Sequence, residues 1–264
     1  MKRTPHQAPA ANEHGPAANE KGPAANEQGS AAHYQGQDLE ALADMPRYSD
    51  WIVGQFAHHL GGRVLEVGAG IGNVSQRYVD NAAAALLVEP AANLYPRLVD
   101  RFAHLPHVQT CNNLLKDVPQ SLTDEPFDAA IMVNVLEHIE DDEACLRRVH
   151  DLLTDRGKLL LFVPALPALF GTLDRLVHHH RRYTFESLAG ALQRSGFYPV
   201  HLRYFDVMGM LPWLIAGRVL RRDRFDPEGA RLYDRFGVPL TAFVERHIVP
   251  PLGKSLTCIA CKKH

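Results

Sequence analysis

The chain has 264 residues, of which 46% are hydrophobic, and it carries a formal net charge of −2. This length and composition predict one sizeable globular domain, and the near-neutral charge gives no reason to expect nucleic acid as a partner. Four cysteines in a chain this long do not make a disulfide scaffold, and no apolar run approaches the roughly 18 residues of a membrane span. No signal peptide is expected either, so we expect a cytoplasmic protein.

The chain begins with a seven-residue repeat. Residues 9–29 read PAANEHG, PAANEKG and PAANEQG, and a decayed copy, SAAHYQG, follows over residues 30–36. Proline and glycine in every copy forbid a continuous helix, and such polar sequence cannot bury enough apolar surface to offset the entropy of ordering it. We therefore predict a disordered tail over residues 1–36, either without function or partner-binding, and a folded domain over residues 37–264.

Beyond the tail, stretches with the apolar spacing of helices alternate with short apolar runs that are typical of strands. Helices are expected over residues 38–60, with a break at Pro46, and over residues 73–79, 94–102, 141–153 and 185–195. Strands are expected over residues 64–67, 84–88, 108–111, 127–133, 158–163, 200–205 and 255–261. This alternation predicts an α/β fold with a parallel, doubly wound sheet and an antiparallel edge made from the last two strands.

The most informative motif follows the first strand. Glu66 lies near the end of this strand, and a glycine loop comes directly after it, made of Gly68, Ala69, Gly70, Ile71 and Gly72. Three glycines let the backbone approach a nucleotide-like ligand closely, and the next helix would direct its free N–H groups at that ligand. Asn73 stands where the dinucleotide fingerprint has its third glycine, so the loop departs from that of nicotinamide-dependent enzymes.

Two further strands end on polar residues that suit a bound nucleotide. Glu89, followed by Pro90, ends the second strand, where a carboxylate can accept both ribose hydroxyls. The strand over residues 127–133 ends at Asn134, and the turn Leu136-Glu137-His138 follows it. Because the carboxyl ends of parallel strands share one edge of a sheet, we expect these side chains to lie in one crevice.

These motifs resemble those of class I S-adenosylmethionine-dependent methyltransferases. The glycine loop is similar to their E/D-x-G-x-G-x-G motif, residues 127–138 to their fourth motif, and residues 152–164 to their L-L-x-P-G-G-x-L turn and strand. The resemblance implies a Rossmann-like sandwich: a seven-stranded, mostly parallel sheet with helices on both faces. It implies S-adenosyl-L-methionine as the cofactor, with Asn112 or Asn113 at the adenine in place of the acid of many relatives. The cofactor-binding residues implied in this way are Glu66, Gly68, Ala69, Gly70, Gly72, Glu89, Pro90, Asn112, Asn113, Asn134, Val135 and His138.

The acceptor site is expected around a run of basic residues. Residues 163–184 are similar to a subgroup of these enzymes with the pattern V-P-A-L…F-D…G-H-Y-R-R-Y-T, except that three histidines replace Gly-His-Tyr. Arg181 and Arg182 can clamp an anionic acceptor, although a solvated basic face is the alternative. No acid or cysteine joins the histidines at ligand spacing, so no metal is expected. The candidate catalytic residues are His179, His180, Asp174 and Tyr183.

A second candidate for the acceptor site is the mostly apolar segment over residues 207–220, expected to be a helix or helix pair broken at Pro212. It is interpreted as a core-packing helix, as a lid over an apolar acceptor or, because arginines flank it, as a membrane-surface helix. Lid segments are expected at about residues 164–184 and 206–250, with Phe205, Trp213 and Tyr48 as further acceptor-binding residues. Cys258 and Cys261 are expected to fill the core.

Together these features predict a methyltransferase for a small amphipathic or anionic molecule, such as a natural product, by O-, N- or C-methylation. Two alternatives stay open: C-methylation of a prenyl diphosphate, and a module that binds S-adenosylmethionine without catalysis. A nicotinamide-dependent oxidoreductase is disfavoured by Asn73 and the Leu-Glu-His turn. The partner is a small-molecule substrate, with peripheral membrane contact as an option, and the oligomeric state stays open.

Overall fold

The computed structural model describes residues 34, 44–222, 224 and 226–263. The chain divides into two compact units, residues 1–30 and 31–264, and every described residue belongs to the second unit. The predicted tail over residues 1–36 therefore lies outside the described residues apart from Tyr34, and so does the first part of the helix expected over residues 38–60.

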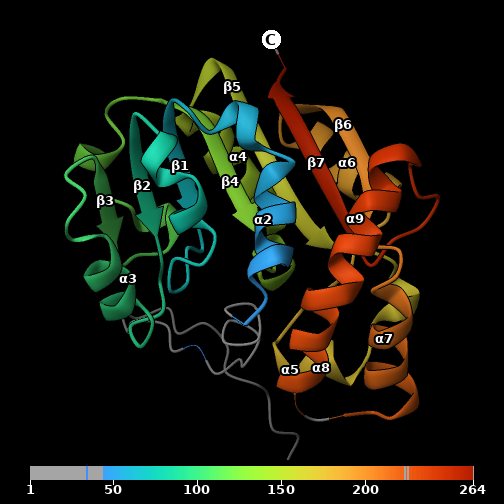
Figure 1. The fold of residues 1–264 in the computed structure, drawn as a ribbon. Helices are drawn as coiled ribbons and strands as arrows, with labels where there is room; N and C mark the ends of the chain where they lie inside the picture. The colour runs from blue at the N-terminus through green and yellow to red at the C-terminus, as the bar shows by residue number, and fades with distance from the viewer. Residues whose placement is uncertain (1–33, 35–43, 223, 225, 264) are drawn as a thin grey trace, which may run out of the picture. The chain divides into compact units, whose positions relative to one another are not determined.

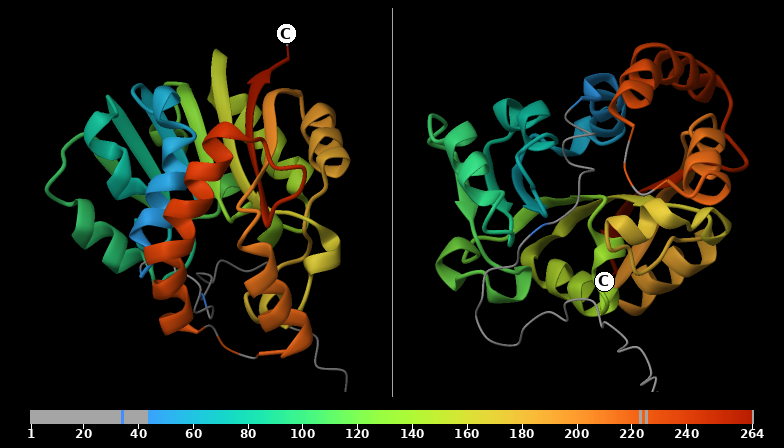
Figure 2. Two further views of the ribbon diagram at one scale, coloured as in Figure 1. Left: turned by 45° about the vertical axis from the view of Figure 1, so that its right-hand side comes forward. Right: turned by 90° about the horizontal axis from the view of Figure 1, so that it is seen from below.

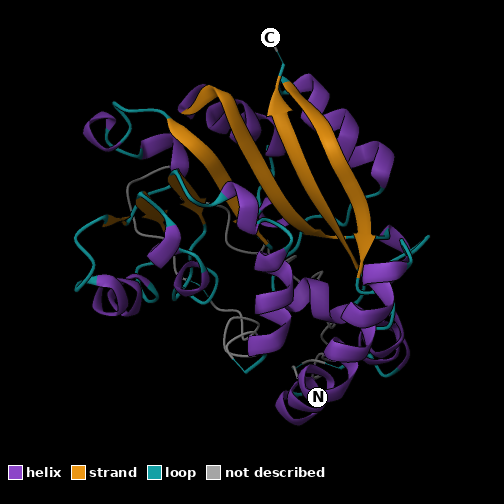
Figure 3. Ribbon diagram, turned by 45° about the horizontal axis from the view of Figure 1, so that its top comes forward, coloured by secondary structure: helices purple, strands orange, loops and turns teal. Residues whose placement is uncertain are grey.

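One seven-stranded sheet organises the described unit, with the strand order β3-β2-β1-β4-β5-β7-β6. The strands are β1 Arg63–Val67, β2 Ala84–Val88, β3 Val108–Cys111, β4 Phe127–Val133, β5 Leu153–Pro164, β6 Phe197–Phe205 and β7 Ser255–Lys262. β1 to β5 pair in parallel, whereas β7 runs antiparallel to both β5 and β6 (Figures 1 and 3). The predicted α/β fold is confirmed, with the refinement that β7 alone runs against the sheet and β6 forms its edge.

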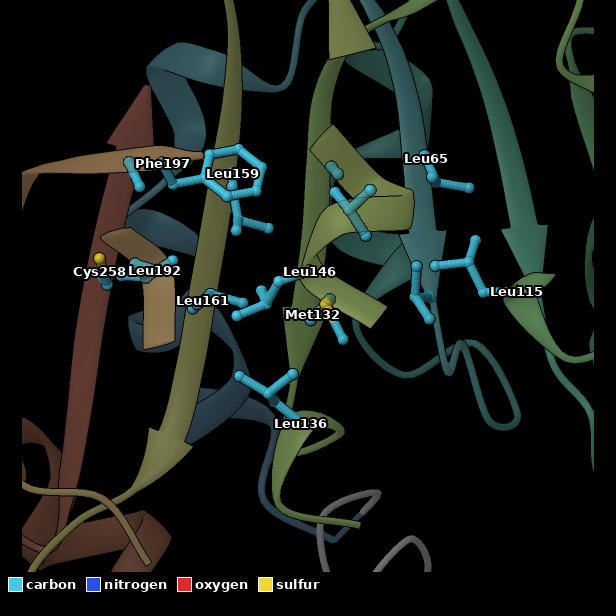
Figure 4. Close-up of a cluster of buried hydrophobic side chains, with 14 of the residues drawn as sticks. Leu65, Leu115, Met132, Leu136, Leu146, Leu159, Leu161, Leu192, Phe197 and Cys258 are labelled. Carbon is cyan, nitrogen blue, oxygen red and sulfur yellow. The ribbon is translucent and has the colours of Figure 1, made fainter. Parts of the chain in front are cut away.

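Helices cover both faces of the sheet. The helices are α2 Pro46–Gly54, α3 Tyr95–Phe102, α4 Asp142–Leu152, α5 Thr172–Leu176, α6 Phe185–Arg194, α7 Met210–Leu214, α8 Pro227–Leu232 and α9 Val238–His247. One buried cluster contains residues of α4 and α6, and the other contains residues of α2, α3 and α9. Figure 4 shows side chains of the first cluster, among them Leu146 of α4, Leu161 of β5 and Leu192 of α6. All three are fully buried, and truncating such a leucine to alanine costs about 2–5 kcal/mol of stability.

The helix expected over residues 38–60 is described only from residue 44 onward. There α2 begins at Pro46, because a proline suits a first turn, where the missing N–H has no partner to lose. The stretch before residue 44 lies outside the described residues, so the break expected at Pro46 stays a prediction. The helix expected from Asn73 is replaced by two single 3₁₀ turns, Ser75–Arg77 and Val79–Asn81. Between these turns Tyr78 directs its hydroxyl to the buried carboxylate of Glu66, at an oxygen–oxygen distance of 2.8 Å. This side-chain contact, together with the weak helix propensity of valine, serine and asparagine, outweighs the apolar spacing.

A helical insertion over residues 206–254 connects β6 to β7 and lies beyond the carboxyl ends of the parallel strands (Figures 1 and 2). In it, α7 continues into a π-helix, η8 Ile215–Val219, and α8 continues through a second π-helix, η9 Tyr233–Gly237, into α9. The break expected at Pro212 is absent, because Pro212 lies in the first turn of α7. Of the helices in the described part of the chain, none is long and apolar enough to cross a membrane.

The two cysteines of β7 were both expected to fill the core, and only one of them does. Cys258 is fully buried in the cluster with α4 and α6, which confirms its role as core filler. Cys261 is only partly buried, and its sulfur lies 2.9 Å from Nζ of Lys158. Both thiols are free, so neither forms a disulfide.

Candidate active site

The glycine loop adopts backbone conformations that only glycine takes up easily. Gly68, Gly70 and Gly72 have φ angles of 72°, 57° and 83°, in the left-handed region. A Cβ atom added to Gly68 would lie 2.5 Å from Cγ2 of Val135, the second residue after β4. The loop is fixed from the other side by β2, because the N–H groups of Gly68 and Ala69 both donate to the carbonyl of Val88. The loop is thus held between the carboxyl ends of β2 and β4.

Two buried carboxyl groups flank the glycine loop. Glu66 accepts a hydrogen bond from Tyr78, and burial raises its pKa to about 7. Glu89 follows β2 and accepts hydrogen bonds from the N–H groups of Gly70 at 2.7 Å and Ala91 at 2.8 Å. Burial raises the pKa of Glu89, while these two hydrogen bonds favour its charged form. Glu89 therefore joins the glycine loop to the end of β2. This is the position at which a ribose-binding acid was expected from the sequence. The half-buried Pro90 follows it.

The asparagines after β3 have different surroundings. Asn112 donates its side-chain N–H to the carbonyl of Glu89 at 2.7 Å, so it lies directly beside the β2 end. Asn113 turns back to its own strand, where its side-chain oxygen accepts from the thiol of Cys111 at 3.3 Å. Of the two residues considered for the adenine, Asn112 is the one that the structure brings to Glu89.

A cavity of about 730 Å³ lies between the carboxyl ends of β4 and β5 and the helical insertion. Asn134, which follows β4 with a φ of 52°, lines this cavity, and the next residue, Val135, lies against Gly68 of the glycine loop. Most lining side chains are apolar. They are Met45, Phe162, Pro164, Leu173, Val177, Leu211, Pro212, Trp213, Ile215, Ala216, Leu220, Ala230, Leu232 and Phe236, with the tyrosines Tyr48 and Tyr233.

One wall of the cavity carries a buried cluster of Asp174, His179 and Arg182. Oδ1 of the fully buried Asp174 lies 2.7 Å from Nε of Arg182 and 3.1 Å from Nδ1 of His179, and Oδ2 accepts from the N–H of Gly171. Burial opposes the ionisation of Asp174, but the hydrogen bonds from His179 and Arg182 outweigh it and lower the pKa of the carboxyl. An ionised carboxylate with these partners orients His179 and Arg182 and is a weak proton acceptor.

A second buried cluster, which we did not predict from the sequence, surrounds Asp206. This carboxylate accepts hydrogen bonds from the hydroxyls of Tyr48 and Tyr233 and pairs with Nζ of Lys254 at 2.8 Å. Nζ of Lys254 lies 4.6 Å from the ring centre of Tyr48. Trp213 joins this cluster to the first one, because its ring faces both Lys254 and Arg182. No local motif marks Asp206 or Lys254, which are 48 residues apart in the sequence and meet only in the fold.

Several predicted site residues lie away from the cavity. Tyr183 donates its hydroxyl to Asp142 at 2.8 Å, and Arg181 pairs with the same carboxylate at 2.9 Å. His180 is exposed, and Phe205 is fully buried in the core, with its ring 3.8 Å from that of Trp51. Tyr183 forms a parallel bridge with Ala165, and neighbours along such a stretch point to opposite sides. Arg182 therefore lines the cavity while Arg181 and Tyr183 do not, and the expected pair of arginines does not form one clamp.

The histidine run does meet an acid, contrary to the sequence prediction. Candidate ligand atoms of Glu137, His138 and His179 all lie within 4.8 Å of one another, and Nε2 of His179 is 3.7 Å from Oε1 of Glu137. Burial and the neighbouring histidines lower the pKa of His138 to about 3, so its ring is neutral near pH 7. Three such groups could hold a metal ion. The acid comes from a turn some 40 residues earlier, which linear spacing does not reveal.

Comparison with known proteins decides the family. A family model described as a methyltransferase domain matches residues 38–202, more than half of the chain. The chain belongs to the class I S-adenosylmethionine-dependent methyltransferases. This methyltransferase is therefore an enzyme whose cofactor is S-adenosyl-L-methionine, as the motifs predicted.

Relatives of this methyltransferase are distant. It is 28% identical over 179 residues to a ubiquinone biosynthesis O-methyltransferase of Xanthomonas euvesicatoria, covering 61% of this chain and 72% of the relative. Its fold is similar to that of the 1,6-didemethyltoxoflavin-N1-methyltransferase of Burkholderia thailandensis, with a TM-score of 0.57, 17% identity and coverage of 86% and 82%. It is also similar to the [4+2]-cyclase SpnF, with a TM-score of 0.55, 20% identity and coverage of 83% and 81%.

Proposed function

We propose that this methyltransferase methylates a small, largely apolar molecule that binds in the cavity beyond β4 and β5. The cavity itself carries this proposal. Its volume of about 730 Å³ suits a small molecule, and its lining is mostly apolar. Four polar side chains, Asn134, His179, Arg182 and Lys254, lie at its inner end, while the exposed Arg222, Arg224 and Asp226 lie on its outer side. An acceptor with one polar group and an apolar body matches this distribution.

The residues at the carboxyl ends of β1 to β4 fit the cofactor. We assign the backbone of the glycine loop to its amino-acid end, the carboxylate of Glu89 to the ribose hydroxyls and Asn112 to the adenine. We assign Pro90, Asn134, Val135 and His138 to the border of the same site. Support comes from the left-handed glycines and from the contacts that join Glu89 to Gly70 and Asn112. When bound, the cofactor supplies a methyl group on a positively charged sulfur, so this chain has only to align the acceptor and accept its proton.

We assign the removal of the acceptor proton to His179. Of the four predicted catalytic residues, only His179 lines the cavity. Asp174 acts as a positioning residue, because its buried carboxylate holds Nδ1 of His179 at 3.1 Å. His180 and Tyr183 have no place in this assignment, since the first is exposed and the second donates to Asp142.

The prenyl diphosphate alternative has less support. The reacting double bond of such a substrate lies next to its charged group, so cations would be needed near Asn134. The two cations there, Arg182 and Lys254, already pair with the buried carboxylates of Asp174 and Asp206. Arg222 and Arg224 also line the cavity but are exposed, on its outer side. An apolar acceptor with a hydroxyl is the class to test first, in keeping with the O-methyltransferase named among the relatives.

Labelled methyl transfer tests the proposal. The full chain is incubated with S-adenosylmethionine carrying a labelled methyl group and with a metabolite extract divided into organic and aqueous fractions. We expect label in one organic-soluble product, identified by its mass. Transfer confined to phosphorylated molecules of the aqueous fraction would contradict an apolar acceptor. Binding of the cofactor without any transfer would instead favour the non-catalytic alternative.

A pair of neighbouring variants tests the proton acceptor. His179→Ala should lower kcat by about 100-fold or more, the usual contribution of a general base. His178→Ala, at an exposed neighbour outside the cavity, is the matched control and should retain activity. The dissociation constant of S-adenosylhomocysteine should change less than twofold in both variants. Equal activity of the two variants would remove His179 from the mechanism.

A further inference from the structure

The exposed apolar side chains of this methyltransferase are concentrated in the insertion between β6 and β7. Of 16 large apolar side chains exposed in the described part of the chain, 13 lie between Met208 and Leu252. The other three are Leu114, Tyr198 and Val200. Exposed apolar residues are ordinary when scattered, but a group confined to one segment marks an interaction surface.

Part of this group surrounds the entrance of the acceptor cavity. Five side chains both line the cavity and remain 40–62% exposed, and we name them the apolar rim: Leu211, Ile215, Leu220, Leu232 and Phe236. Val219 and Leu240 extend the rim outward, because they follow Ile215 and Phe236 by four residues on the same helices and are 68% and 53% exposed. The two helices that carry the rim stand opposite each other, with a gap between their ribbons, in the left view of Figure 2.

Arginines accompany the apolar rim. Residues 218–235 contain six arginines against four acids, in a chain whose net charge is −2. One of the acids, Asp234, is buried beneath the surface, where it accepts hydrogen bonds from α2. Arg222, Arg224 and Asp226 are exposed and line the cavity entrance together with the rim, and Arg222 pairs with Asp226 at 2.9 Å. Arg231 pairs with Asp44 at 3.2 Å. The entrance therefore combines apolar side chains with two arginines against one acid.

We propose that the apolar rim and its arginines dock on an anionic lipid bilayer. Apolar side chains that enter the acyl boundary while arginines contact lipid phosphates are the pattern of interfacial helices. A second copy of this chain fits less well, because a two-fold contact would bring like-charged arginines together and would close the cavity entrance. In an anionic bilayer, the lipid phosphates can pair with the arginines, and the acyl chains can cover the apolar rim.

Docking in this orientation turns the cavity entrance toward the lipid. An apolar acceptor then passes from the bilayer into the cavity without crossing water, a consequence that rests on the proposed function. The docking itself does not depend on the acceptor. Vesicle binding without substrate therefore tests the surface alone, and its failure is distinct from a failure of the acceptor assignment.

The test is co-flotation of the full chain with large unilamellar vesicles. We expect the chain to bind vesicles of phosphatidylcholine with 30 mol% phosphatidylglycerol at least tenfold more strongly than pure phosphatidylcholine vesicles, and to be released as salt increases. Arg221→Glu should lower the partition coefficient at least fivefold. Arg156→Glu, the same charge change on an exposed residue of β5, is the control and should bind normally.

A second pair of variants tests the apolar contribution. Val219→Ser with Leu240→Ser should lower the partition coefficient at least tenfold, whereas Leu114→Ser with Val200→Ser, of similar exposure elsewhere, should not. Neither Val219 nor Leu240 lines the cavity. Equal binding of both vesicle types, or equal binding by the rim and control variants, would overturn the proposal. So would light scattering that shows a dimer which Val219→Ser with Leu240→Ser dissociates, since the surface would then be a self-interface.

Discussion

At the scale of single residues, Glu66 is the carboxyl whose ionisation is most costly beside the glycine loop. It is 3% exposed, its neighbour Glu89 is also an acid, and its hydrogen bond from Tyr78 does not compensate fully for burial. Its pKa of about 7 therefore means that the native protein holds this proton more firmly than the unfolded chain does. Glu66, a residue of the family's glycine-loop motif, therefore makes the stability of the fold depend on pH.

Glu66→Gln should remove the contribution of Glu66 to this pH dependence. Because the folded pKa is raised, the stabilising contribution of the protonated carboxyl is complete below the unfolded value of 4.5 and is lost as pH rises through about 7. A shift of this size corresponds to about 3 kcal/mol. Urea unfolding at pH 5, 6, 7 and 8 should show a decline in wild type that is clearly smaller in Glu66→Gln. Glu125→Gln, at an exposed glutamate, should keep the decline, and a variant profile parallel to wild type would refute the prediction.

Some residues of the site could be predicted from short sequence motifs, and others could not because their contacts join distant parts of the chain. Glycines at alternate positions and an acid at a strand end are local patterns, and the structure brings Gly70, Glu89 and Asn112 together as those patterns indicated. The acceptor wall is different. Whether Arg182 or Arg181 lines the cavity depends on the bridge between Ala165 and Tyr183, and Lys254 reaches Asp206 only through the complete sheet. Contacts between distant residues of this kind produce no periodic pattern in the sequence.

At the scale of elements, buried strands were the easiest to predict. The strand expected over residues 127–133 has those bounds in the structure, because a continuous apolar run between polar residues has one stable placement in a covered parallel sheet. The 3₁₀ turns after the glycine loop and the two π-helices were not predicted. The 3₁₀ turns accompany a tertiary contact, the hydrogen bond of Tyr78 to Glu66, that overrides local propensity. The π-helices have no local sequence signal.

The start of α2 depends on another element. Its own N-cap residue, Met45, provides no side-chain acceptor. Asp234 of η9 supplies one instead, accepting from the N–H groups of Tyr48 at 2.8 Å and Arg47 at 3.3 Å. The helical insertion and α2 are thus joined by a capping contact between residues 186 positions apart.

Asp234→Ala should destabilise the protein by about 1–2 kcal/mol, since it removes a helix cap and leaves buried N–H groups without an acceptor. Amide exchange should show the largest loss of protection at the start of α2. Asp226→Ala is the control, because Asp226 caps its own helix, α8, and α2 should keep its protection in that variant. Equal protection of α2 in both variants would show that the contact has no such role.

At the scale of the whole molecule, the two halves of the site come from different parts of the chain. The family model matches residues 38–202, which include the glycine loop and β1 to β5. Much of the cavity lining comes from the insertion that follows, between β6 and β7. Binding of the cofactor and binding of the acceptor should therefore be separable by substitution.

Ala216→Trp should separate them. Ala216 lies on η8 and lines the cavity, so a tryptophan there takes up space that the acceptor needs. We expect kcat/KM for the acceptor to fall at least 100-fold, while calorimetry shows a change of less than twofold in the dissociation constant of S-adenosylhomocysteine. Ala144→Trp, on the exposed side of α4, is the control. Loss of cofactor affinity in Ala216→Trp alone would mean that the two halves are coupled.

The sheet cannot be completed until β7 has been synthesised. β7 is last in chain order yet lies between β5 and β6, pairing with both. While the ribosome is still synthesising it, β5 has an uncovered edge and β6 has no partner strand. Such an edge is a template for association with other chains, so a pause in translation before residue 255 should favour misassembly. Lys254 and Ser255 also line the cavity, so the last strand to be made completes the acceptor site.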